Sequence, residues 1–162
     1  STNNAGLILA IGFFGTSIAG ILGGRLLNNL GSRRLGFAGI VITATGLCAV
    51  SLVNGPDDIP WMLLALFIQG IGTGLFQTSY MYSITGMLPS DQRGVSGSIT
   101  MLTRTIGVVS GVTILTLVFS WLDAAGNEFQ ESFKFIFNLV GGGLFLFLLT
   151  TLPWPQVWFR KI

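Results

Sequence analysis

Five long stretches of this chain carry almost no charge, and this feature constrains its fold more than any other. A helix needs about 20 mostly apolar residues to cross the hydrocarbon core of a bilayer. Four of the stretches contain no charged residue, and the other contains only Arg104. They do not alternate in hydrophobicity over about ten residues, as the strands of a membrane β-barrel would. The sequence therefore predicts an all-α membrane protein with five transmembrane helices, at residues 5–24, 35–54, 61–88, 95–122 and 135–152.

The composition excludes several other classes of protein. The 162 residues are 51% hydrophobic and 9% charged, whereas soluble domains are about 25% charged. A soluble enzyme domain and a disordered chain are both excluded. The net charge of +2 is small and scattered, so no nucleic-acid partner is expected. The chain has no histidine and one cysteine, Cys48, and no catalytic constellation within the spans. We therefore expect no enzyme, no metal site and no cofactor.

The charges of the connections predict the orientation in the membrane. Short cytoplasmic connections are enriched in Lys and Arg. Residues 25–34, residues 89–94 and the C-terminal tail are basic, whereas residues 55–60 and 123–134 are mainly acidic. We therefore expect the segment to begin outside and to end in the cytoplasm, across the plasma (inner) membrane. The outside start and the absence of an initiator methionine favour a fragment that lacks at least one upstream span.

The third predicted span carries a row of polar side chains. Gln69, Thr73, Gln77 and Tyr80 follow one another at steps of four, four and three residues, so they share one side of a helix. We call this row the polar face. Polar groups in a membrane helix need a partner or a wet cavity. The polar face therefore either lines a substrate cavity or forms hydrogen bonds that hold neighbouring helices together.

Small residues recur at helical spacing in the first and fourth spans. Gly15, Ala19 and Gly23 are four residues apart, as are Gly107 and Gly111. In lipid, helices associate through close packing, which small residues allow. We expect these positions to be helix-packing sites.

Arg104 lies within the fourth span, about 15 Å from its cytoplasmic end if the helix starts at the preceding connection. An arginine at this depth either has a function or reaches the headgroups or neighbouring carbonyl groups with its long side chain. Its guanidinium keeps its charge, so it is a poor proton carrier. We expect an electrostatic or helix-pinning role, for example beside a carboxylate from an upstream part of the protein.

A motif after the first span resembles the cytoplasmic loop signature of the major facilitator superfamily, G-x-x-x-D-[RK]-x-G-x-[RK]-[RK]. Asn28 stands where the family places Asp, and Asn29 stands where it places Arg or Lys. The residues that occupy the signature are Gly24, Asn28, Asn29, Gly31, Arg33 and Arg34.

A longer stretch is similar to the drug:proton antiporter branch of that superfamily. It runs from Gly70-x-Gly72-x-Gly74-Leu75-Phe76-Gln77 through Pro89, Arg93-Gly94-x-Ser96-Gly97 and Arg104-x-x-Gly107-x-x-x-Gly111. The resemblance implies the last five helices of a six-helix C-terminal bundle. The third span would line the central cavity, the first and fourth would face the missing N-terminal half, and the second and fifth would lie outside.

The expected function is part of a secondary transporter that exports small amphipathic compounds or drugs by alternating access, coupled to protons. Its expected partners are the lipid bilayer, a small-molecule substrate, protons and the missing N-terminal helical half. A metabolite or sugar transporter on the same scaffold is an alternative. A membrane subunit that only packs against other proteins is a second alternative, from a different class.

Overall fold

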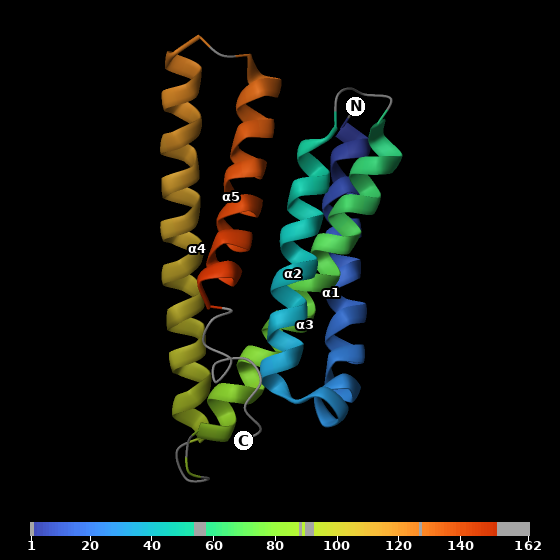
Figure 1. The fold of residues 1–162 in the computed structure, drawn as a ribbon, viewed down its shortest axis with the longest axis vertical. Coiled ribbons are helices and arrows are strands. Elements are labelled where there is room, and N and C mark those ends of the chain that lie inside the picture. The colour runs from blue at the N-terminus through green and yellow to red at the C-terminus, as the bar shows by residue number, and fades with distance from the viewer. Residues whose placement is uncertain (1, 54–57, 88, 90–92, 127, 152–162) are drawn as a thin grey trace.

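The computed structural model describes residues 2–53, 58–87, 89, 93–126 and 128–151, and these form five long helices (Figure 1). Every helix is long and apolar enough to cross a membrane, and the described residues contain no strand. The predicted all-α fold with five transmembrane helices is thus confirmed. The helices are α1 (Thr2–Leu30), α2 (Ser32–Ser51), α3 (Ile59–Met87), α4 (Arg93–Ala124) and α5 (Phe129–Thr151).

The helix bounds differ most from the predicted spans between α1 and α2. Residues 25–34 were expected to form a connection, but Gly31 alone separates the two helices. Gly31 has a φ of 76°, a left-handed conformation that glycine adopts without steric cost. Leu27 and Leu35 on either side of the turn are 8% and 1% exposed and belong to one apolar cluster. The helices continue here because burial of these leucines extends the packed region beyond the charge-free stretches.

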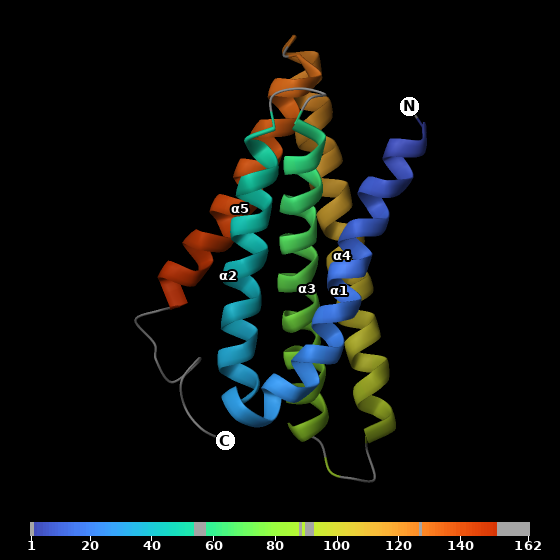
Figure 2. The same cartoon turned by 90° about the vertical axis from the view of Figure 1, so that its right-hand side faces the viewer.

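Helix α3 lies between α1 and α2 and makes the most extensive contacts of the bundle (Figure 2). On the α1 side, a Cβ added at Gly15 would lie 2.6 Å from the carbonyl oxygen of Phe67. On the α2 side, a Cβ added at Gly46 would lie 2.6 Å from the backbone nitrogen of Gln69. Both distances are shorter than any real contact of a Cβ atom. Glycine at these crossings therefore lets three helix backbones approach closely.

Helix α5 packs against the other side of α2. A Cβ added at Gly141 would lie 2.6 Å from the Cys48 sulfur, so this contact also depends on a glycine. The hydroxyl of Ser51 adds a polar link, 3.0 Å from the side-chain amide oxygen of Asn138. The contact with α2 therefore fixes α5 to the three-helix unit.

Helix α4 is the least buried of the five, with every residue from 101 to 110 exposed. It contacts α5, and it contacts α3 near the end of the bundle where α3 ends and α4 begins (Figure 1). Phe119 of α4 packs edge-on against Phe129 of α5, with 5.5 Å between ring centroids. Most of the α4 surface thus has no neighbour among the described helices.

Candidate functional site

The polar face of α3 is half-buried along its whole length. The side-chain amide of Gln69 donates to the hydroxyl of Thr73 over 3.2 Å, and that hydroxyl lies 2.9 Å from the carbonyl oxygen of Gln69. The ring of Tyr80 stacks on Phe76, with 6.2 Å between centroids. These two contacts stay within α3, so the polar face does not hydrogen-bond α3 to another described helix at these positions. The amide of Gln77 has no hydrogen-bond partner among the described residues.

The packing of α3 determines which way the polar face points. Leu75, which is 8% exposed, clusters with Ala19 of α1 and with Leu35 of α2. At 100° per residue, Thr73, Gln77 and Tyr80 lie on the opposite side of α3 from Leu75. They therefore point away from the junction of α1 and α2. Helix α4 lies on the other side of the bundle from α1 (Figure 1).

Arg104 is exposed and has no hydrogen bond or ion pair with another described residue. It shares a side of α4 with the residues that are buried or half-buried. The helical spacing places one row of residues on this side of α4, namely Ser96, Thr100, Gly111 and Leu115. Arg104 lies between Thr100 and Gly111 in this row. The side chain of Arg104 therefore leaves α4 on the side of the helix that faces the bundle.

The loop-signature residues lie together at the turn between α1 and α2. Gly24, Asn28 and Asn29 are exposed in the last turns of α1, and Arg33 and Arg34 lie in the first turn of α2. The sequence analysis missed Ser79, which is 5% exposed and donates its hydroxyl to the carbonyl oxygen of Ser32. This bond attaches α3 directly to the start of α2, beside the signature. The signal in the sequence was a serine within an apolar span, and its burial and partner emerge only from the structure.

The two predicted sets of small packing residues, on α1 and on α4, have different surroundings in the structure. Gly15, Ala19 and Gly23 face α3, where Ala19 is 1% exposed and Gly23 meets Thr78. A hydroxyl that the sequence analysis did not single out, that of Thr16, lies 3.1 Å from the carbonyl oxygen of Gly70 within the same contact. On α4, a Cβ added at Gly107 or Gly111 would meet nothing within 4 Å. A packing role for these two glycines stays a prediction.

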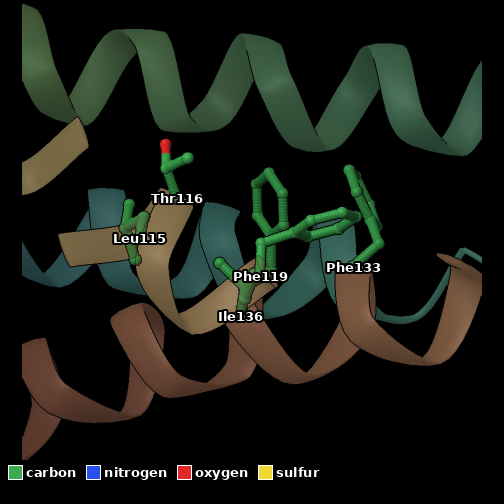
Figure 3. Close-up of a pocket in the computed structure, with 6 residues that line it drawn as sticks. Leu115, Thr116, Phe119, Phe133 and Ile136 are labelled. Atoms are coloured by element: carbon green, nitrogen blue, oxygen red, sulfur yellow. The ribbon is translucent and has the colours of Figure 1, made fainter. Parts of the chain in front are cut away.

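A pocket of about 280 Å³ opens between α4 and α5 (Figure 3). Phenylalanine rings from both helices gather there, and the hydroxyl of Thr116 is its polar group. None of the predicted site residues lines it. The lining residues are Leu115, Thr116, Phe119, Phe133, Ile136 and Phe137. The pocket lacks charge and suits an apolar body.

We expect the polar face to be accessible to water in the full-length protein. With Cys48 and any other native cysteine of the full-length protein replaced by alanine, cysteines at Thr73 and Gln77 should react with a hydrophilic, positively charged methanethiosulfonate reagent. A cysteine at Leu75, which is 8% exposed, should react much more slowly because α1 and α2 cover it. Gln69 should give an intermediate rate, since its backbone packs against Gly46. Equal labelling at Gln77 and Leu75, measured by mass spectrometry, would contradict a water-filled cavity on this side of α3.

The five spanning helices and their small-residue contacts define a polytopic α-helical membrane protein. The sequence model of the Major Facilitator Superfamily matches residues 1–159. The chain belongs to the major facilitator superfamily, a family of transporters and not of enzymes, so the predicted family resemblance is confirmed.

Several known proteins are similar to this chain. A probable triacylglyceride transporter of Mycobacterium leprae is 29% identical over 71% of the chain and 25% of its own length. The multidrug resistance protein MdtH of Cronobacter sakazakii is 28% identical over 80% of the chain and 28% of its own length. Hexose transporter 1 of Toxoplasma gondii is 29% identical over 74% of the chain and 20% of its own length. The chain spans about a quarter of the length of these relatives. No solved structure matches it.

Proposed function

We propose that this segment belongs to a secondary transporter that moves small amphipathic compounds by alternating access, coupled to protons. The observation that carries the proposal is the half-buried polar face of α3, which points away from the packed junction of α1 and α2. Polar groups on a membrane helix are energetically unfavourable unless they face water or a partner. A substrate pathway beside α3 would supply such surroundings. The similarity to a multidrug resistance protein supports drugs as a substrate class.

In this proposal the described helices form most of one half of the transporter. The large exposed side of α4 fits a helix that faces other parts of a longer chain, and α5 fits an outer position beside α2. Helix α3 lines the cavity, and Arg104 supplies a fixed positive charge. The relatives are about four times as long as the matched segment, which supports a second helical half.

Charge supports the proposed orientation across the plasma (inner) membrane. Arg25, Arg33 and Arg34 lie where α1 meets α2, the end we propose to be cytoplasmic. Asp123, Glu128 and Glu131 lie where α4 meets α5, at the opposite end. The predicted orientation also used charged residues that the structure does not describe, namely Asp57, Asp91, Arg160 and Lys161. Arg93 lies at the start of α4, but its side chain is not described.

Reconstitution of the full-length protein into liposomes with an internal pH indicator tests this function. Adding an amphipathic substrate should release or consume protons in the lumen, because substrate and proton movements are coupled. The Gln77→Leu variant should transport several-fold more slowly, whereas Tyr82→Phe, on another side of α3, should match the wild type. Absence of proton movement with every amphipathic compound of a broad panel would contradict the proposal.

Hexose transport is the second candidate, favoured by the similarity to Hexose transporter 1. The same liposomes distinguish it, since radiolabelled glucose would then accumulate and amphipathic compounds would not compete. The non-transporting alternative predicts no flux of either class.

A further inference from the structure

We propose that Arg104, Gln77 and Tyr80 form a binding site for the anionic group, a carboxylate or a phosphate, of an amphipathic substrate. This proposal rests on the transport function above and names the class of substrate that the site selects.

The first step is that the two helices present these residues at the same depth. Gln77 lies about 15 Å before the end of α3 at Met87, and Arg104 lies about 16 Å after the start of α4 at Arg93, at 1.5 Å per residue. The end of α3 and the start of α4 lie side by side at one end of the bundle (Figures 1 and 2). Gln77 and Arg104 are therefore at one level of the membrane, on neighbouring helices.

The second step is that both side chains belong to the sides on which the helices can face each other. Gln77 and Tyr80 are opposite Leu75, which is covered by α1 and α2. Arg104 is in the row of α4 that includes the buried Ser96 and the half-buried Thr100. Both positions thus share a side of their helix with residues that pack within the bundle, and the Arg104 side chain itself is exposed among the described helices.

The third step is that the donors at this level are unused and the space beside them is open. Arg104 and the Gln77 amide have no hydrogen-bond partner among the described residues, and the Tyr80 hydroxyl has none either. A Cβ at Gly107, one turn beyond Arg104, would meet nothing within 4 Å. A ligand group can therefore bond to these donors without breaking a hydrogen bond between described residues.

The fourth step concerns the sign of the charge. Residues 61–88 and 95–122 contain no Asp or Glu, and Arg104 is the sole charged residue in those stretches. A guanidinium binds a carboxylate or phosphate through two parallel hydrogen bonds, and the amide and phenol can each donate one more. In a medium of low dielectric constant, an uncompensated positive charge attracts anions and repels cations. The site therefore selects anionic amphipathic compounds over cationic ones.

The test uses the purified full-length protein in nanodiscs of zwitterionic lipid and three ligands with the same apolar body: 2-naphthoate, 2-naphthylmethanol and 2-naphthylmethylammonium. Isothermal titration should give the tightest binding for naphthoate and the weakest for the ammonium compound. Arg104→Gln should weaken naphthoate binding at least about tenfold, as expected for loss of hydrogen bonds to a charged group, and should leave naphthylmethanol binding unchanged. Arg104→Lys should retain part of the preference.

A matched control moves the charge to the next position. The double variant Arg104→Gln, Thr105→Arg keeps the net charge of α4 but turns the guanidinium by about 100°, and it should not restore naphthoate binding.

Equal binding of the three ligands, or no binding of any, would overturn the proposal. So would unchanged naphthoate affinity in Arg104→Gln, which would place the guanidinium among lipid headgroups. Equal loss of all three ligands in that variant would assign the arginine to helix pinning. Failure of proton-coupled transport with intact naphthoate binding would instead count against the proposed function alone.

Discussion

Replacement of Gly39 by leucine is expected to prevent the bundle from folding. A Cβ at Gly39 would lie 2.7 Å from the backbone nitrogen of Phe76 and 2.9 Å from the carbonyl oxygen of Gly72. These are backbone atoms of α3, which cannot move aside without separating α3 from α2. Overpacking of a close contact costs about 1–3 kcal/mol or more. Gly39→Ala should therefore lower the free energy of unfolding by about 2 kcal/mol or more, and Gly39→Leu should yield no monodisperse protein.

Gly20→Ala is the matched control for this prediction. Gly20 lies in the middle of α1, and a Cβ there would meet nothing within 4 Å. Alanine favours helix over glycine by about 1 kcal/mol, so this variant should be as stable as the wild type or slightly more stable. Thermal unfolding in detergent and size-exclusion chromatography measure both effects. A Gly39→Ala protein with the melting temperature of the wild type would show that α2 and α3 are farther apart than the structure places them.

The number and type of helices could be predicted from the sequence because a bilayer sets a minimum length for apolar runs. The bounds could not, because a helix does not end where its apolar run ends. Helix α5 begins at Phe129, six residues before the predicted span, with Glu131 in its first turn. A carboxylate near a helix N-terminus is favourable, so polar residues extend this helix beyond the hydrocarbon core.

The candidate site was predictable only in part, for a geometric reason. Helical spacing shows that Gln69, Thr73 and Gln77 share a side of α3, but not what that side faces. The direction depends on where α1 and α2 pack, and glycines such as Gly39 and Gly70 determine this packing. The packing of α2 against α3 also separates Gln69, whose backbone lies against Gly46, from Gln77, which is half-buried and whose amide has no hydrogen-bond partner among the described residues. The pattern of a single helix does not show which way its polar face points, because that direction depends on how α1, α2 and α3 pack together.

Loss of the Arg104 charge is expected to have the largest effect on activity. In the full-length transporter, Arg104→Ala should lower the initial rate of transport of an anionic amphipathic substrate by about 100-fold, because about 3 kcal/mol of charged hydrogen bonding is lost. Arg104→Lys should retain a substantial part of the rate, since an ammonium keeps the charge but lacks the planar fork of donors. Counterflow measurements with radiolabelled naphthoate in proteoliposomes provide these rates.

The pH dependence of the residual transport separates the role of Arg104 from that of the proton-carrying group. A guanidinium keeps its proton throughout the range in which proteins are folded, and the predicted spans contain no Asp, Glu or His. Under the proposed coupling we therefore expect groups outside these spans to carry the proton, and the pH profile of Arg104→Ala should keep its shape while its height falls. A profile displaced toward higher pH would show that Arg104 neighbours the proton-carrying carboxylate, because removal of a nearby positive charge makes a carboxylate easier to protonate. In that case Arg104 would act on the coupling step, and the anionic substrate would bind elsewhere.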